Sequence, residues 1–414
     1  MAIEIKNLHI NGVEIPVIYE RSTQLPLFYI QLIFKGAGGV SNGKSLGLSD
    51  ITSSLLNEGT KELGVTRFSK KLEEKALALN VGSGLETLSF TLSGMSAMQK
   101  DGISLLKELL HSPNFTQKAL EKVKESSLVA ILERENDYDY QASRVLKSIL
   151  FKGSALEFPL SGTRDSIAKI TLKEIEKFYQ QHINLSSLIL IVGGDMEFAN
   201  VAKELESALK QLPQGKPTTL TPIVAHDSMQ TKRLLKETQQ AYIYFGAPLE
   251  VANLEKESAL LKVASFVLGG SGFGSRMLEE VRVKRGLAYS AVMRLNATRT
   301  QAWAQGYLQT SLKNEQEAQK IVQEVVDEFV KNGITEKELQ EAKHYLLGSE
   351  PLRNETLSQR LGAAFHNYYN GLPLDFNKKV LEEISKLTLK EVNHYIKTHK
   401  EIQKLSFAIV SAED

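Results

Sequence analysis

The sequence predicts an α/β protein with two related domains, each a mixed β-sheet covered by helices. Three observations predict this class. Short apolar segments typical of strands are interleaved with longer segments of helical periodicity. The same order of segments occurs in both halves of the chain. A proline-bearing stretch lies between the halves, as expected of a domain linker.

The first half opens on a predicted strand at Phe28–Gly38, where apolar residues alternate as in a half-buried strand. A helix is predicted next at Leu46–Leu56, and a second strand at Leu85–Leu92. Ser187–Asp195 is a nearly continuous apolar run, typical of a central strand. Apolar residues at i, i+3 and i+4 predict the remaining helices at Ala97–Leu110, Lys118–Glu135, Ala142–Leu150 and Leu172–Gln181.

The second half repeats this order with a strand at Tyr242–Leu249, a helix at Ser258–Leu268 and a strand at Leu287–Leu295. A closing strand is predicted at Leu405–Val410. The same periodicity predicts helices at Asn314–Lys331, Glu336–Leu347, Leu357–Tyr369 and Leu389–Thr398. The repeated order indicates an internal duplication.

The linker is predicted around Leu212–Ile223, which contains three of the ten prolines. Proline fixes φ and lacks an N–H, so this stretch should be extended and loop-like. The predicted division is a first domain at residues 1–212, a linker at 213–223 and a second domain at 224–414.

Composition excludes several classes of protein. Lys plus Arg is 50 and Asp plus Glu is 49, and this balance argues against binding nucleic acid by neutralising phosphates. The absence of cysteine excludes disulfides, cysteine-ligated zinc, iron–sulfur clusters and thiol catalysis. No apolar stretch approaches the ~20 residues of a membrane helix. The start MAIEIKNLHING lacks a signal-peptide core, which predicts a cytoplasmic protein; a signal removed beforehand would instead indicate the periplasm.

Most short motifs in the chain favour structural roles. None of the eight histidines lies in an H-E-x-x-H or H-x-x-E-H motif. The loop Gly269–Ser275 (GGSGFGS) would suit a nucleotide phosphate, but it follows a helix and lacks the P-loop Lys-Ser/Thr. We therefore favour a helix-to-helix turn and keep a nucleotide-binding module as a minor alternative.

Gly47–Thr60 (GLSDITSSLLNEGT) resembles the inverted zinc-binding segment of the pitrilysin, insulysin and mitochondrial processing peptidase family. Active members carry H-x-x-E-H in this frame, with two histidines on one helix face to hold zinc and a glutamate as general base. Here the histidine positions are Asp50 and Ser54, and the glutamate position is Ser53. Two hydroxyls and one carboxylate cannot replace two imidazoles and that base.

The family's third zinc ligand is a glutamate on a later helix, and Glu121–Glu135 resembles that helix. The family spacing places Ala130 in the ligand position. The resemblance therefore implies that this chain holds no zinc and has no cofactor of its own.

The second half retains the family's C-terminal signature. Leu268–Ser290 (LGGSGFGSRMLEEVRVKRGLAYS) carries its R-x6-Y pair at Arg282 and Tyr289. In active members the guanidinium fixes substrate carbonyls and the phenol stabilises the developing oxyanion. The alternatives are an Arg282 that faces solvent or pairs with Glu279, and a Tyr289 that is a core aromatic.

The resemblance implies a half-clamshell of two domains and the role of a non-catalytic subunit in a heterodimeric zinc metallopeptidase. A homologous H-x-x-E-H partner would supply zinc, and Arg282 and Tyr289 would act in trans on an oligopeptide. Leu85–Leu92 corresponds to the strand that pairs with peptide in active members, and here it either still binds peptide or is a relic. The alternative is a structural scaffold without a role in catalysis. The isolated chain is a monomer or a homodimer, and the sequence favours neither.

Overall fold

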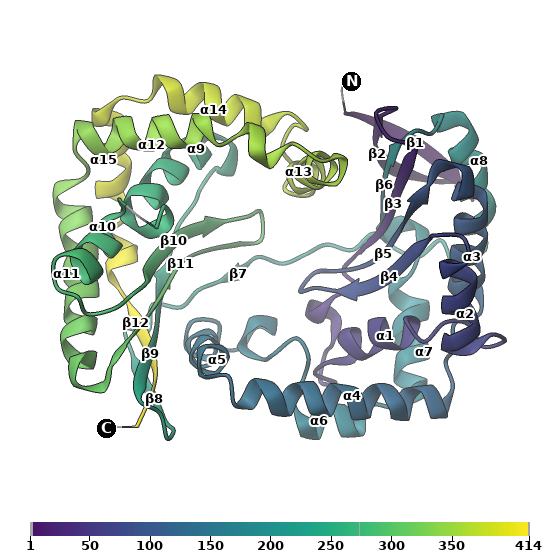
Figure 1. Ribbon diagram of the computed structural model, residues 1–414, viewed down its shortest axis with the longest axis horizontal. Coiled ribbons are helices and arrows are strands. Elements are labelled where there is room, and N and C mark those ends of the chain that lie inside the picture. Colours follow the sequence, from purple (N-terminus) through teal and green to yellow (C-terminus); the bar gives the residue numbers. More distant parts are fainter. Residues whose placement is uncertain (1–2, 273, 413–414) are drawn as a thin grey trace. The chain divides into compact units, whose positions relative to one another are not determined.

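Two β-sheets organise the chain, one in each of two units (Figure 1). The computed structural model describes residues 3–272 and 274–412. The first unit contains Met1–Leu132, Pro159–Leu220 and Asn354–Tyr368. The second unit contains the other segments, Glu133–Phe158, Thr221–Arg353 and Tyr369–Asp414.

The first sheet has the strand order β1-β2-β6-β3-β5-β4. β2 and β6 are parallel, and the other neighbours are antiparallel. Its most central apolar run, β6, is buried at every residue, as its continuous apolar sequence predicted. The strands are β1 (Glu4–Ile10), β2 (Val13–Arg21), β3 (Leu27–Lys35), β4 (Ala78–Ser83), β5 (Thr87–Met95) and β6 (Leu188–Gly194).

The first unit has helices from both halves of the chain. Those from the first half bury their apolar stripes in one core with this sheet, and one helix from the second half lies on the other face of the sheet. The helices are α1 (Leu48–Leu56), α2 (Gly64–Glu73), α3 (Gln99–His111), α4 (Gln117–Glu135), α6 (Arg164–Lys169), α7 (Leu172–His182), α8 (Phe198–Leu209) and α13 (Leu357–Tyr369).

The second sheet has the order β10-β11-β9-β12-β8, and the short β7 pairs with one end of β11. β12 and β8 are parallel, whereas β12–β9, β9–β11 and β11–β10 are antiparallel. The strands are β7 (Ile223–Val224), β8 (Thr231–Leu235), β9 (Gln240–Pro248), β10 (Ala291–Ala297), β11 (Gln301–Ser311) and β12 (Ser406–Ser411).

The second unit also has a helical layer that shares a core with its sheet, whereas α5 (Tyr138–Leu150) joins a separate small core. The α-helices are α5 (Tyr138–Leu150), α9 (Leu254–Ser265), α10 (Arg276–Leu278), α11 (Glu315–Asn332), α12 (Glu336–Gly348), α14 (Phe376–Lys386) and α15 (Leu389–Thr398). Two π-helical turns extend α9 and α10, at Phe266–Gly270 and Glu279–Val283. Such turns are rare and often lie at functional sites.

The two sheets confirm the predicted duplication. Strands β2-β6-β3-β5-β4 of the first sheet and β8-β12-β9-β11-β10 of the second have the same order and the same relative directions. Equivalent helices also start alike. Thr171 caps α7 and Thr388 caps α15, each in a reciprocal capping box with the glutamate three residues on. The predicted fold class, mixed sheets covered by helices, is confirmed.

Each sheet receives one helix from the other half of the chain. α5 packs against β9 and β12, where Leu146 and Leu150 join a small core with Trp303 and Ala408. Phe407 and Ile409, the neighbours of Ala408, belong to the main core, so α5 covers the opposite face of the second sheet.

α13 covers the corresponding face of the first sheet, opposite its main core. Leu361 packs over Gly193 of β6, where a Cβ atom would come within 2.5 Å of the leucine. Arg360 of α13 forms an ion pair with Glu20 of β2 at 2.7 Å. The predicted contiguous domains 1–212 and 224–414 therefore differ from the observed units in two exchanged segments, because an amphipathic pattern does not specify which sheet a helix covers.

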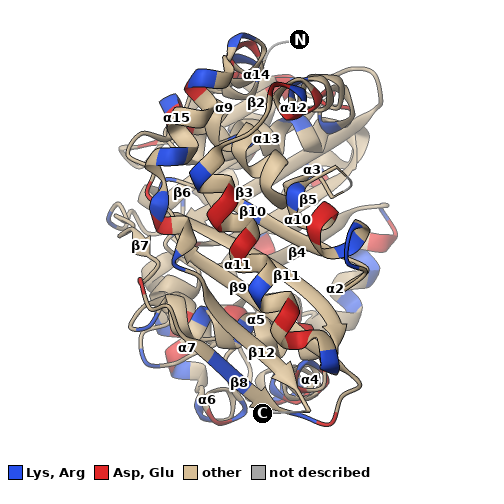
Figure 2. Ribbon diagram, turned by 90° about the vertical axis from the view of Figure 1, so that its left-hand side faces the viewer, with Lys and Arg blue, Asp and Glu red and all other residues tan. Residues whose placement is uncertain are grey.

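Charged residues of both signs are interspersed along the helices in the view of Figure 2. This distribution accompanies the near-neutral total charge of the chain. None of the helices in the described part of the chain combines the length and apolar character that a membrane crossing requires.

Candidate functional site

The degenerate zinc segment forms α1 of the first unit. Ser53 occupies the general-base position, is buried, and donates its hydroxyl to the Asp50 carbonyl oxygen over 2.9 Å. Thr52 likewise donates to the Leu48 carbonyl oxygen over 2.7 Å. These hydroxyls are therefore used within the helix itself, as is typical of Ser and Thr at interior helix positions.

The residues at the four family positions do not fit a zinc ion. Ala130, on α4, has no donor atom, and Ser54 offers only a hydroxyl beside the single carboxylate of Asp50. Within residues 3–272 and 274–412, no three His, Asp or Glu side chains are grouped so that they could hold a metal ion. We therefore assign no reaction step to a zinc ion on this chain.

The strand predicted to bind peptide needs a correction. Leu85 precedes β5, and Thr87–Leu92 lie within it, between β3 on one side and β4 on the other. A strand with two neighbours has no free row of backbone groups for an added peptide. The edge of the first sheet on this side is β4, so strand addition at Leu85–Leu92 is wrong.

Arg282 and Tyr289 are brought together in the second unit. The Arg282 Cζ atom lies 4.3 Å from the centre of the Tyr289 ring, which is a cation–π contact. The Tyr289 side chain is 81% exposed, so the alternative of a core aromatic is wrong. Tyr289 also lies in the loop before β10 rather than within the strand predicted at Leu287–Leu295.

The turn between the two residues is held by backbone geometry. Arg282 lies in the π-helical turn Glu279–Val283, and Gly286, three residues after this turn, redirects the chain with a φ of 62°. Gly286 N–H donates to the Arg282 carbonyl oxygen over 2.9 Å, and Leu287 N–H donates to the Val281 carbonyl oxygen over 2.9 Å. These bonds set the position of the chain as it leaves the helix.

A buried threonine fixes the segment that carries Tyr289. Leu287 and Ala288 are buried, and the Leu287 carbonyl oxygen accepts a hydrogen bond from the Thr310 hydroxyl over 2.6 Å. Thr310 is 2% exposed and belongs to β11. Tyr289 is thus an exposed side chain on an anchored segment. Sequence reasoning missed Thr310, because β11 carries several other polar residues and nothing in its sequence singles out this one.

Glu280 pairs with the other cations of this stretch. It contacts Lys284 and Arg285 at 2.5 Å each. Burial alone would raise the pKa of Glu280, but the hydrogen bonds from these two cations outweigh that effect and lower the pKa. Arg282 is therefore the arginine of this stretch that lies against Tyr289, while its basic neighbours neutralise a carboxylate.

The glycine loop has a packing explanation. A Cβ atom on Gly269 would lie 2.4 Å from the Met293 backbone nitrogen, so only glycine allows the π-helical turn to approach β10 this closely. Phe273, within the loop Gly269–Ser275, lies outside the described residues. The close approach accounts for Gly269 without a nucleotide.

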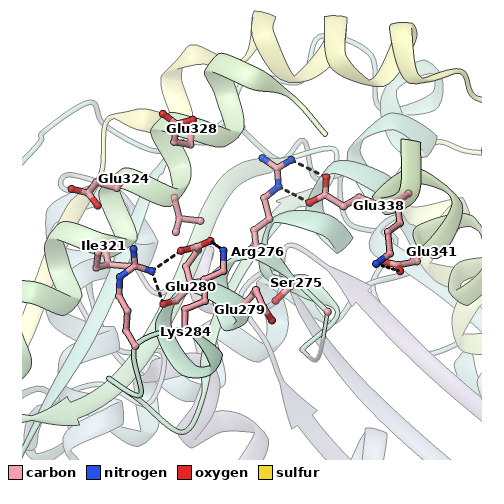
Figure 3. Close-up of a pocket in the computed structure, with 14 residues that line it drawn as sticks. Ser275, Arg276, Glu279, Glu280, Lys284, Ile321, Glu324, Glu328, Glu338 and Glu341 are labelled. Atoms are coloured by element: carbon pink, nitrogen blue, oxygen red, sulfur yellow. Dashed lines mark hydrogen bonds and ion pairs between the residues drawn. The ribbon is translucent and has the colours of Figure 1, made fainter. Parts of the chain in front are cut away.

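A pocket of about 680 Å³ lies beside this segment (Figure 3). Its charged lining is largely paired internally, and Arg276 donates two hydrogen bonds to Glu338, of 2.6 and 2.8 Å. The lining residues are Gly274, Ser275, Arg276, Glu279, Glu280, Lys284, Arg285, Ile321, Glu324, Val325, Glu328, Lys337, Glu338 and Glu341. The Arg276–Glu338 pair ties α10, where the Arg282 segment begins, to α12.

We expect Glu338→Gln to lower the free energy of unfolding by about 1–2 kcal/mol at neutral pH, because a bidentate charged pair is lost. Burial alone would raise the pKa of Glu338, but hydrogen bonds from Arg276 and Thr335 lower it below the ordinary 4.5. A carboxyl with a lowered folded-state pKa stabilises the protein above its unfolded pKa, and this stability is lost as pH falls through the folded pKa. Urea unfolding should therefore show a full difference at neutral pH that shrinks below pH 4.5. A pH-independent difference would contradict this assignment.

Comparison with known proteins places this architecture in a family. Residues 169–346 match the description "Peptidase M16 inactive domain". The chain is 46% identical over 402 residues to the non-peptidase homolog YmxG of Helicobacter pylori, an alignment that covers 97% of this chain and 93% of that protein. It is 23% identical over 352 residues to the uncharacterized zinc protease YmxG of Bacillus subtilis, with 84% of each chain covered.

A solved structure agrees with these sequence matches. The peptidase M16 inactive domain from Pseudomonas fluorescens has a TM-score of 0.89 and 23% identity, with 100% of this chain and 98% of that chain covered. The chain therefore belongs to the peptidase M16 family. The predicted family is confirmed, and the matches agree with a non-catalytic member of it.

Proposed function

We propose that this chain is the zinc-free subunit of a two-chain zinc peptidase. A homologous subunit with an H-x-x-E-H motif would supply the metal and the general base. This chain would supply Arg282 and Tyr289. The observation that carries the proposal is the exposed Tyr289 ring, held against the Arg282 guanidinium on an anchored turn.

The chemistry of the pair suits a peptide substrate. A guanidinium combines a face that stacks on an aromatic ring with in-plane N–H donors that match carbonyl oxygens. The Tyr289 hydroxyl can donate a hydrogen bond to the oxyanion that develops when a peptide carbonyl is attacked. An exposed tyrosine in a fixed segment needs no reorganisation to do so. The substrate class is an oligopeptide or an unfolded segment.

The test is a native pull-down of this chain from its own source. The eluate would be analysed by intact-complex mass, zinc content and cleavage of a mixed peptide library. We expect two different chains, about one zinc per pair, and activity that this chain alone lacks. An inactive, metal-free complex would contradict the proposal.

Arg282→Ala should weaken both substrate binding and turnover of the assembled peptidase. Loss of a charged hydrogen bond to a carbonyl corresponds to an increase in KM of about tenfold. Steady-state kinetics with a quenched fluorescent peptide would measure it. Arg285→Ala is the matched control, because Arg285 pairs with Glu280. Equal effects of the two substitutions would argue against a specific role of Arg282.

A scaffold role is the second candidate. The name of the Helicobacter pylori relative, non-peptidase homolog, suits both a helper subunit and a scaffold. In a scaffold, Arg282 and Tyr289 would be incidental, and neither substitution would change the kinetics of a partner enzyme.

A further inference from the structure

β4 is the edge strand of the first sheet, but a side chain of the same unit already pairs with it. Asn57, the residue that caps the C-terminus of α1, donates from Nδ2 to the Val81 carbonyl oxygen over 2.8 Å. Its Oδ1 accepts the Val81 N–H over 2.9 Å. Both backbone groups of Val81, in the middle of β4, therefore have a partner in α1.

The register shows that these are the outward groups of the edge. Residues in an antiparallel pair alternate between hydrogen-bonded and non-hydrogen-bonded positions. Gly84 N–H donates to the Thr87 carbonyl oxygen over 2.8 Å, so this pair is hydrogen-bonded. Counting back by two, Gly82 and Asn80 bond to β5. Val81 lies between them and directs its N–H and C=O away from β5.

The Asn57 carboxamide thus occupies the place of a peptide group in an added strand. It offers one donor and one acceptor to one residue, as a neighbouring strand does. The same Nδ2 atom donates to the Ser53 carbonyl oxygen over 3.0 Å, which fixes the side chain against α1. Beyond β4, Val40 N–H donates to the Leu85 carbonyl oxygen over 2.8 Å, so the following turn is also paired.

The second unit repeats this arrangement independently. β10 is the equivalent edge strand, and its Leu295 N–H donates to the Ser265 Oγ over 3.0 Å. Ser265 is the last residue of α9, which follows β9 as α1 follows β3. In each unit, a polar side chain at the end of the same helix therefore bonds to the edge strand.

We propose that Asn57 closes the β4 edge to strand addition, so that an extended peptide pairs with β4 only when this carboxamide is removed. Unprotected edge strands recruit extended chains through their free backbone groups. The proposal goes beyond the function proposed above, because it concerns the first unit alone and needs no partner subunit. In the assembled peptidase, the strand that pairs with substrate would then belong to the partner.

The experiment compares the full wild-type chain with Asn57→Ala. The probe is a fluorescein-labelled, unstructured peptide of alternating valine and serine, and binding is measured by fluorescence anisotropy. We expect Asn57→Ala to bind at least about tenfold more tightly than wild type, since two backbone groups are released for pairing. Hydrogen exchange at the Val81 amide should be faster in the free variant and slow again with peptide.

Two further variants make the test specific. Asn80→Ala is the matched control, because Asn80 is exposed on the same strand and its backbone bonds to β5. It should bind like wild type. Asn57→Asp keeps the acceptor for the Val81 N–H but cannot donate to the Val81 carbonyl oxygen. Its affinity for the peptide should therefore lie between those of wild type and Asn57→Ala. If Asn57→Ala fails to fold, Asn57→Asp alone must still bind more tightly than wild type.

Two outcomes would overturn the proposal, and a third would support it. Peptide binding by wild type with a protected Val81 amide would contradict the proposal, because the edge would then be open already. An Asn57→Ala variant with unchanged affinity and unchanged Val81 exchange would show that Asn57 does not close the edge. Self-association of Asn57→Ala through β4, seen as doubled mass with a protected Val81 amide, would support an opened edge occupied by a second copy.

Discussion

Tyr289→Phe lowers kcat of the assembled two-chain peptidase by about 10²–10³, according to the role proposed for this residue. One hydrogen-bond donor to a developing oxyanion contributes about 3–4 kcal/mol to transition-state stabilisation. Phenylalanine removes only the hydroxyl and keeps the ring against Arg282, where the two groups lie 4.3 Å apart. Steady-state kinetics should therefore show a large fall in kcat and a small change in KM.

The control for this experiment is a second exposed tyrosine of the same unit. Tyr345 is 51% exposed on α12, and Tyr345→Phe should leave kcat unchanged. Native mass measurement would establish that both variants still assemble with the partner. An assembled Tyr289→Phe complex with wild-type turnover would exclude the oxyanion role and favour the scaffold.

The sequence predicted the Arg282–Tyr289 pair but not what holds it in place. The R-x6-Y spacing and the surrounding signature identified the two residues. Thr310, which fixes the segment through the Leu287 carbonyl oxygen, comes from β11, far along the chain. A hydrogen bond between distant segments leaves no periodic signal in a sequence, so the anchoring of Tyr289 could not be predicted.

The strands show the same division between local and long-range information. β3, β9 and β6 were predicted because their apolar patterns are local. β1 and β2 were not predicted, and β2 contains Pro16, which usually argues against a strand interior. Pro16 is tolerated because β6 pairs with β2 only from Val17 onwards. That exception depends on the pairing register of β6, which lies far from β2 in the sequence.

The exchange of α5 and α13 between the halves was also beyond sequence reasoning. Both helices have an apolar stripe that a sheet must cover, and the predicted helices at Ala142–Leu150 and Leu357–Tyr369 are present. The apolar stripe does not determine which sheet the helix packs against, because either sheet offers an apolar face. The choice is made by specific contacts, among them the pair that Arg360 of α13 forms with Glu20 of β2.

Arg360→Ala should therefore be one of the most destabilising single substitutions in the first unit. Glu20 is 3% exposed and accepts hydrogen bonds from Arg360 of 2.7 and 3.0 Å. Removing the arginine leaves a buried carboxylate without this partner, which costs about 3 kcal/mol or more. Hydrogen exchange should increase in β2 and α13 together. Arg144→Ala, at an exposed arginine of α5, should change stability by less than about 0.5 kcal/mol.

A double variant separates the loss of α13 docking from the penalty of an unpaired charge. If the penalty dominates, Glu20→Leu combined with Arg360→Leu should recover most of the stability, because an apolar pair replaces the buried ions and leaves no unpaired charge. Urea unfolding of Glu20→Leu, Arg360→Leu and the double variant gives the coupling energy between the two side chains directly. A double variant as unstable as the worse single variant would mean that the ion pair itself, rather than the burial of α13, attaches this helix to the first sheet.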